Sequence, residues 1–218
     1  SSIPRPSSLR TAIASNKTAT TPVLHAYQRD MSRVMGPQDV RRFDAAAATI
    51  AMGTCATFGG IPAAAPNPTG CVGLKELFES RGVKTPVINI AGCPPHPDWF
   101  VGTVASVLLF GLPSPEQLDD FGRPLAFYGK LIHENCQRRA YFDEGKFAKK
   151  HSDPGCLYEL GCKGPVTYAD CPTRLWNTGV NWCVGSGGGC HGCVQPEFPD
   201  LLSPLYVKTI EIQFPSKG

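Results

Sequence analysis

Cysteine is the residue type with the most distinctive chemistry in this chain of 218 residues. There are ten cysteines, and seven of them follow residue 125. Disulfide-dense proteins are usually small domains without a sufficient core, whereas a chain of this length can bury a sizeable one. Most of the cysteines also lie in loops beside glycine, proline or another cysteine. They therefore favour ligation of a metal or an iron–sulfur cluster over a disulfide framework.

The first candidate ligand set combines one histidine with three cysteines: His133, Cys136, Cys156 and Cys162. One imidazole and three thiolates can hold a [4Fe–4S] cube. A neutral imidazole in place of a thiolate removes a negative charge, which favours the reduced cluster. A zinc ion bound by three cysteines and a histidine uses the same ligand types. From the spacing alone, both a cluster and a zinc ion remain open for this set.

The second candidate set contains four cysteines: Cys171, Cys183, Cys190 and Cys193. The last two form a Cys-x-x-Cys hairpin, which is common to zinc and iron–sulfur sites. A glycine-rich run at 185–189 precedes this hairpin. Glycines let backbone N–H groups approach the sulfides of a cluster closely, and a zinc ion has no such sulfides. The second set therefore favours a cluster.

The third set is incomplete, because it contains only Cys55 and Cys93. Two thiolates do not complete a cube. Cys71 is left over, and a simple free cysteine in a packed environment is the preferred interpretation for it. His96 and His191 lie beside candidate ligands, and we expect them to support the ligands by hydrogen bonding rather than to bind a metal.

Other classes of function find little support in the sequence. It contains no Ser/His/Asp arrangement, phosphate loop or spaced carboxylate pair, so we assign no catalytic residue. The formal net charge is +3 with 18% charged residues, which gives no strong footprint for nucleic-acid binding. No apolar run is long enough to span a bilayer directly, since the stretch at 100–111 is too short.

The elements expected to position these cysteines form an α/β unit. Apolar runs at 45–52 and 86–90 each end in a turn that contains glycine and cysteine, which predicts buried parallel strands. Residues 74–81 between them predict a crossover helix, and residues 98–111 a second helix. Cys55 and Cys93 would then follow the carboxyl ends of neighbouring strands, where ligands bind in open α/β sheets.

The chain divides into three segments on these patterns. Residues 1–45 are poorly specified, residues 46–124 form the predicted α/β domain, and residues 125–218 form a cysteine-rich domain. The boundary is placed in the stretch 112–124, which contains three prolines. Hydrophobic periodicity fades beyond it, so bonds between ligands and metal would supply what the core does not.

Five runs in the chain carry a resemblance to one family: 53–64, 92–99, 132–136, 160–171 and 176–196. They resemble the cluster-binding loops of the small subunit of nickel–iron hydrogenases, over roughly three quarters of the chain. The resemblance implies a flavodoxin-like parallel-sheet domain, incomplete at its N-terminus, followed by a loop-rich iron–sulfur domain.

The resemblance also implies which cluster each set holds. The set with His133 would bind a distal [4Fe–4S] cluster, and the set with Cys171 a medial one. Many family members have proline where this sequence has Cys183, and their medial cluster is [3Fe–4S]. A cysteine there resembles the nickel–iron–selenium type. We therefore predict a medial [4Fe–4S] cluster with Cys183 as fourth ligand, with [3Fe–4S] as the alternative.

Cys55 and Cys93 would bind a proximal [4Fe–4S] cluster, provided that its remaining ligands are supplied. The family takes two further ligands from an N-terminal Cys-x-x-Cys loop, and residues 1–54 contain no such motif. Three explanations stay open: the N-terminal part of the subunit is missing, another polypeptide supplies the ligands, or the proximal site is altered.

For function, the resemblance implies electron transfer between a large partner subunit with a nickel–iron centre and an external acceptor such as a c-type cytochrome. This chain would itself break no substrate bond. A stand-alone iron–sulfur carrier or adapter, a hydrogen-sensing subunit and a structural zinc module remain as alternatives. The resemblance to periplasmic enzymes implies a periplasmic location, with membrane association only through a partner and a cytoplasmic location as the alternative.

Overall fold

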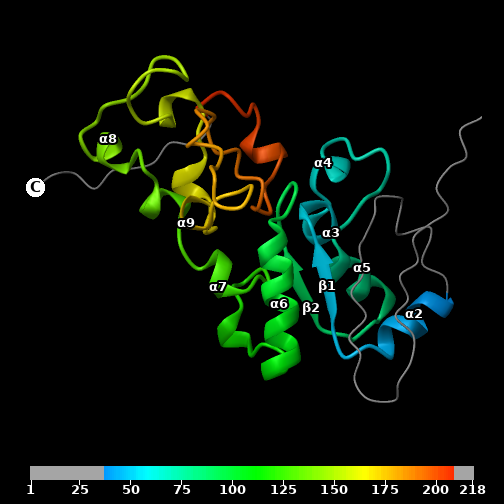
Figure 1. Cartoon of the computed structure of the whole chain (residues 1–218). Helices are drawn as coiled ribbons and strands as arrows, with labels where there is room; N and C mark the ends of the chain where they lie inside the picture. The colour runs from blue at the N-terminus through cyan, green and yellow to red at the C-terminus, as the bar shows by residue number, and fades with distance from the viewer. Residues whose placement is uncertain (1–36, 209–218) are drawn as a thin grey trace, which may run out of the picture.

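The computed structural model describes residues 37–208, so most of the segment 1–45 lies outside the described residues. Figure 1 shows a small α/β unit on one side and a loop-rich unit on the other. The elements of the α/β unit are α2 (Pro37–Asp44), β1 (Thr49–Met52), α3 (Thr54–Phe58), α4 (Gly60–Ala63), α5 (Leu74–Arg81), β2 (Val87–Ile90) and α6 (Pro97–Phe110).

The two strands confirm the predicted parallel pairing. β1 and β2 run parallel in a register that pairs Thr49 with Val87 and Met52 with Ile90. The crossover helix α5 has the predicted bounds. Gly82 follows its last residue, and the φ of 68° at Gly82 is the left-handed conformation that glycine adopts without strain. β1 is shorter than the apolar run at 45–52, because the first alanines of that run form a turn closed by a hydrogen bond from Ala46 N to Phe43 O.

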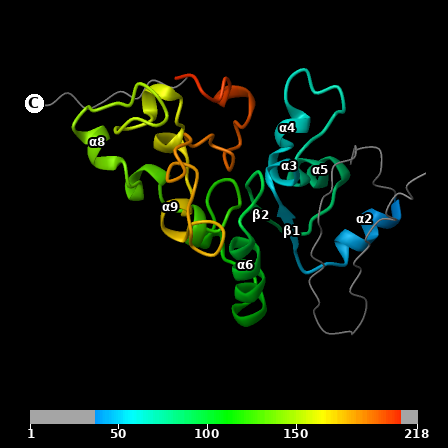
Figure 2. The ribbon, with the colours of Figure 1, turned by 45° about the horizontal axis from the view of Figure 1, so that its top comes forward.

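Helices cover both faces of this sheet (Figures 1 and 2). Side chains of successive strand residues point to opposite faces. Ile50 therefore packs in the cluster that contains Trp99 of α6, whereas Ala51 packs with Leu77 and Phe78 of α5. The strands are thus buried on both sides, as is typical of parallel sheets.

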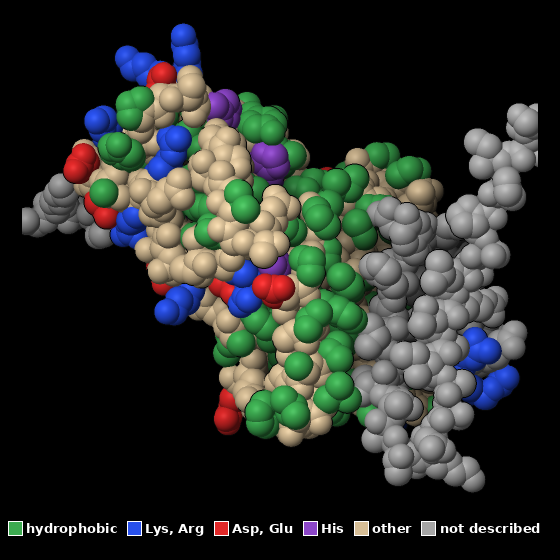
Figure 3. All heavy atoms as spheres, viewed as in Figure 1, with side chains coloured by type: hydrophobic (Ala, Val, Ile, Leu, Met, Phe, Trp, Pro, Cys, Tyr) green, Lys and Arg blue, Asp and Glu red, His purple; other side chains and the backbone are tan. Residues whose placement is uncertain are grey.

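Helix α6 is apolar around much of its circumference. Trp99 and Thr103 are buried, but Leu108, Leu109 and Phe110 near its end are between 70% and 83% exposed. Figure 3 shows hydrophobic side chains at the lower end of this helix. Among the described residues, no helix is both long enough and apolar enough to cross a membrane.

The rest of the chain is made of short helices and turns. Its elements are η1 (Pro115–Gln117), α7 (Leu125–Tyr128), η2 (Ile132–Asn135), α8 (Arg139–Asp143), η3 (Tyr158–Leu160), η4 (Gly164–Val166), α9 (Cys171–Arg174) and η5 (Asp200–Leu202). One hydrophobic cluster extends from Ile50 and Trp99 to Cys162 and Cys190. The sheet and the cysteine-rich loops therefore share one core, which fixes their relative position.

Candidate iron–sulfur cluster sites

Cys55 and Cys93, the incomplete third set, lie on two loops that the sheet brings together. Cys55 is in α3 directly after β1, and Cys93 follows β2. Backbone hydrogen bonds join the two loops, from Gly53 N to Ile90 O (2.7 Å) and from Thr54 N to Gly92 O (2.9 Å). Both cysteines therefore lie at the carboxyl edge of the sheet, as predicted. Cys55 is half-buried and Cys93 is exposed.

The three cysteines of the first set lie near one another. Cys156 and Cys162 are buried, and Cys136 is half-buried. Burial raises the pKa of Cys156 to about 11, and the nearby thiolates of Cys162 and Cys136 contribute to this rise. The three thiols are thus close enough to influence one another electrostatically, although the chain separates them by up to 26 residues (162 − 136).

His133, the fourth member of this set, is buried in η2. Its ring lies edge-on to Phe142, with the centroids 4.2 Å apart. The ring atom Nε2 is buried and has no hydrogen-bond partner among the described residues. Burial, followed by the charge of Arg139, lowers the pKa of His133 from 6.5. The imidazole is therefore kept in its neutral form, which is the form that ligates a metal.

The second set lies between the first and the third. Cys171 and Cys190 are buried, Cys193 is half-buried and Cys183 is exposed. Burial raises the pKa of Cys171 to about 12, with a further contribution from Cys193. Burial likewise raises the pKa of Cys190 well above its ordinary value. The helix α9 begins at Cys171 and so holds its thiol at the start of a rigid turn.

The raised pKa values bear on whether these residues fit an iron–sulfur cluster. Burial is the main cause at the buried and half-buried cysteines of the first two sets: Cys136, Cys156, Cys162, Cys171, Cys190 and Cys193. Buried thiolates need a compensating positive charge, which the irons of a cluster would supply. The Nε2 atom of His133 is buried without a hydrogen-bond partner among the described residues, so it also needs a ligand. Both observations fit a cluster at these residues.

A single metal ion needs its ligands to converge on one point, as the four ligands of a zinc ion do. Within residues 37–208, no three His, Cys, Asp or Glu side chains are grouped closely enough to hold one metal ion. Cys71 is half-buried. Its Sγ accepts a hydrogen bond from Thr69 Oγ1 at 3.1 Å.

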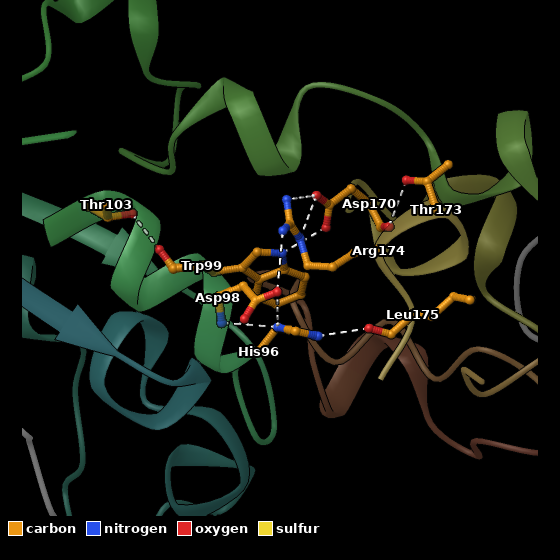
Figure 4. Close-up of polar contacts among 8 residues, drawn as sticks. All are labelled: His96, Asp98, Trp99, Thr103, Asp170, Thr173, Arg174 and Leu175. Atoms are coloured by element: carbon orange, nitrogen blue, oxygen red, sulfur yellow. Dashed lines mark hydrogen bonds and ion pairs between the residues drawn. The ribbon is translucent and has the colours of Figure 1, made fainter. Parts of the chain in front are cut away.

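A polar network joins the loop of Cys93 to the loop of Cys171 (Figure 4). Nδ1 of His96 accepts a hydrogen bond from the Asp98 amide (3.1 Å), which caps α6. Its Nε2 must therefore carry the proton, and it donates to the carbonyl oxygen of Leu175 (2.8 Å). The ring also packs on Trp176, with centroids 4.7 Å apart. His96 thus supports both loops through backbone contacts.

A second part of this network holds α6 against α9. The indole Nε1 of Trp99 donates to Asp170 Oδ1 (2.7 Å). Arg174 donates to Asp170 Oδ2 from two of its nitrogens, at 2.9 Å and 2.6 Å, and lies 3.5 Å from Asp98. Asp170 directly precedes Cys171. The network therefore fixes this ligand relative to the sheet.

Sequence reasoning missed two buried polar residues at these sites. Thr54 is fully buried, and its hydroxyl accepts from Gly92 N (2.8 Å) and donates to the carbonyl oxygen of Cys193. Arg123 is 1% exposed and donates to the carbonyl oxygen of Val194 (2.7 Å). The sequence Gly53-Thr54-Cys55 placed Thr54 beside a ligand. No local signal marked the contact of Arg123 with Val194, because Val194 is 71 residues away.

Two family models match this chain. Residues 128–206 match the model for the C-terminal part of nickel–iron and nickel–iron–selenium hydrogenase small subunits. Residues 38–107 match the model for the 20-kDa subunit of NADH ubiquinone oxidoreductase.

Individual relatives are similar over most of this chain. The small subunit of the periplasmic nickel–iron–selenium hydrogenase of Desulfomicrobium baculatum is 51% identical over 165 residues, which are 73% of this chain and 52% of that protein. The small subunit of the periplasmic nickel–iron hydrogenase of Solidesulfovibrio fructosivorans is 49% identical, over 72% of this chain and 49% of that protein. This chain thus spans about half the length of the curated relatives it matches.

Solved structures agree with these relatives, because those similar to this chain are also hydrogenases. The reduced, active nickel–iron–selenium hydrogenase from Desulfomicrobium baculatum matches with a TM-score of 0.70 and 48% identity, over 77% of this chain and 64% of that one. The recombinant nickel–iron–selenium hydrogenase from Desulfovibrio vulgaris Hildenborough gives 0.72 and 46%, over 79% and 65%. This chain belongs to the family of nickel–iron and nickel–iron–selenium hydrogenase small subunits.

Proposed function

We propose that this chain carries electrons between the large subunit of a hydrogenase and an external redox protein. The observation that carries the proposal is the series of contacts that connects the three ligand sets. The set with Cys190 contacts the set with Cys162 through a hydrogen bond of 3.2 Å between Cys190 N and Cys162 Sγ. It contacts the third set through the hydroxyl of Thr54 and the carbonyl oxygen of Cys193.

The residues of each set support one cluster assignment. His133, Cys136, Cys156 and Cys162 would hold a distal [4Fe–4S] cluster. Cys171, Cys183, Cys190 and Cys193 would hold a medial [4Fe–4S] cluster. Cys55 and Cys93 would hold two corners of a proximal [4Fe–4S] cluster, provided that its remaining ligands are supplied. When bound, such clusters accept and release single electrons; the side chains described here position them and set their surroundings.

The partners of this proposal follow from the family. Hydrogen would be split or formed at the nickel–iron centre of the large subunit, and the electrons would leave or enter near His133. The acceptor would be a c-type cytochrome or a similar redox protein. The relatives from Desulfomicrobium and Solidesulfovibrio are periplasmic, so we place this chain in the periplasm as well.

Purification of the native complex through a tag on this chain tests the proposal. We expect a larger chain that contains nickel to co-purify. Hydrogen gas should then reduce the iron–sulfur clusters of the complex, observed by EPR spectroscopy, but should leave the separated chain oxidised. Clusters in a chain that never associates with a nickel protein would instead support a stand-alone electron carrier. Reduction of the separated chain by hydrogen would contradict the division of labour between the subunits.

A further inference from the structure

The hairpin Cys190–Cys193 is in contact with both neighbouring ligand sets. Cys190 is 6% exposed, and its thiol accepts a hydrogen bond from the amide of Gly192 within the hairpin (3.4 Å). Cys190 and Cys193 are both assigned to the medial site.

Toward the distal site, the hairpin makes a reciprocal pair of hydrogen bonds. The amide of Cys190 donates to Sγ of Cys162 at 3.2 Å. The amide of Lys163, the next residue along, donates back to the carbonyl oxygen of Cys190 at 2.7 Å. Two bonds in opposite directions hold the loops in a fixed register. The thiol of a distal ligand therefore lies against the backbone of a medial ligand.

Toward the proximal site, the hairpin is held by the side chain of Thr54, the residue before Cys55. The hydroxyl of Thr54 accepts a hydrogen bond from Gly92 N (2.8 Å) and donates one to the carbonyl oxygen of Cys193. Thr54 thereby ties the residue before Cys93 to the hairpin.

We propose that the Cys190–Cys193 hairpin couples the three sites through two hydrogen bonds, one from the Cys190 amide to Cys162 Sγ and one from the Thr54 hydroxyl to the Cys193 carbonyl oxygen. Gly189 and Thr54 are the residues that position these two contacts. The inference rests on the proposed function, since it takes the three ligand sets as cluster sites. With clusters bound, one electron would leave one site, which would be oxidised, and enter the next, which would be reduced, and no covalent bond would break.

The hydrogen bonds also set the direction of a measurable effect. An N–H group that points at a ligand sulfur offsets negative charge, so it stabilises the reduced form of the cluster and raises its reduction potential. The Cys190 amide should raise the potential of the distal site, because Cys162 is a distal ligand. The Thr54 hydroxyl should raise the potential of the medial site, because it donates to the backbone of Cys193, a medial ligand.

Gly189 permits the distal contact because it has no side chain. A Cβ atom at this position would lie 3.2 Å from Cα and 3.3 Å from Cβ of Cys162. These distances are tighter than ordinary van der Waals contact, so an alanine would push the two loops apart by a few tenths of an ångström. Gly188 provides a matched control, because a Cβ there would be 3.6 Å from the carbonyl oxygen of Cys183.

The distal arm of the test compares Gly189→Ala with Gly188→Ala in the purified complex. The midpoint potentials of the medial and distal sites are measured by redox titration with EPR detection. We expect Gly189→Ala to shift the distal potential to a more negative value, by more than any shift of the medial potential. Gly188→Ala should leave both potentials at their wild-type values.

The medial arm uses Thr54, whose hydroxyl can be removed without changing the shape of the side chain. Thr54→Val abolishes both hydrogen bonds of the hydroxyl, and Thr54→Ser keeps them. We expect Thr54→Val to shift the medial potential to a more negative value while the distal potential stays unchanged. Thr54→Ser should restore the wild-type medial potential, which separates the hydrogen bonds from general packing.

The two arms predict shifts at different sites: Gly189→Ala at the distal site and Thr54→Val at the medial site. Each arm can therefore overturn the inference independently. Unchanged potentials in Gly189→Ala and Thr54→Val, or shifts at the wrong site, would refute it. So would loss of the neighbouring cluster's iron from a variant whose control retains it, because the residue would then serve assembly rather than coupling. Failure of the proposed function looks different: the wild-type complex would itself show no medial or distal cluster signal.

Discussion

Replacement of Arg123 by methionine should be among the most destabilising single changes in the described part of this chain. The guanidinium is almost completely buried, and it has three oxygen partners. It lies 2.7 Å from the carboxylate of Asp119 and donates to the carbonyl oxygen of Val194 (2.7 Å) and the amide oxygen of Gln195 (2.9 Å). Methionine would fill similar space but would leave the three oxygens without this donor.

The size of the effect follows from the burial of the ion pair. Removal of one partner from a buried pair typically costs about 3–5 kcal/mol, because it leaves an uncompensated charge. Stability of a whole domain is only about 5–15 kcal/mol, so this loss is a large fraction of it. With a guanidinium m-value of about 4 kcal/mol/M, the unfolding midpoint should fall by roughly 1 M.

The chain offers a matched control in Arg139→Met. Arg139 also pairs with an aspartate four residues away, Asp143, at 2.8 Å, but the two side chains are 43% and 54% exposed. An exposed pair of this kind contributes about 0–1 kcal/mol. Both variants are unfolded anaerobically in guanidinium and followed by tryptophan fluorescence and cluster absorbance. An Arg123→Met midpoint no lower than that of Arg139→Met would refute the reasoning.

Three further predictions concern the cluster sites. Cys183→Pro should convert the medial cluster from four irons to three, so the oxidised complex should gain the EPR signal of a three-iron centre; a retained four-iron medial cluster would contradict Cys183 as a ligand. Burial lowers the pKa of His133 below 6.5, so His133 binds a proton more readily in the unfolded chain than in the folded one. The stability of the fold and the retention of the distal cluster should therefore fall as the pH drops below about 6.5. An acid titration of the distal EPR signal tests this, and a signal unchanged down to about pH 5 would argue against a His133 ligand. Asp170→Asn should weaken the contacts with Trp99 and Arg174 and cost about 1–3 kcal/mol in guanidinium unfolding; an unchanged midpoint would show that this network contributes little.

The local pattern was sufficient for the α/β unit. Apolar runs that end in turns predicted both strands, and the crossover helix α5 has the bounds expected for it. The grouping of Cys55 with Cys93 followed from the rule that carboxyl ends of parallel strands share one edge. The start of β1 was wrong by four residues (49 − 45), because alanines are apolar but do not favour a strand over a turn.

Long-range contacts explain what the sequence did not predict. The stretch at 112–124 is predicted to be a boundary between domains, and Arg123 in it is buried against Val194. An arginine in a proline-rich stretch has the pattern of an exposed loop, and only the folded chain brings its three acceptors together. The contact of Cys190 with Cys162 is also long-range, since it spans 28 residues.

The most direct test of the central claim is a measurement of iron, zinc, nickel and acid-labile sulfide in the natively purified protein, per copy of this chain. Two four-iron clusters at the medial and distal sites predict about eight irons and about eight sulfides, and a complete proximal cluster would raise each number to about twelve. Nickel should appear only with a co-purifying larger chain. Zinc without iron or sulfide would contradict the electron-transfer account.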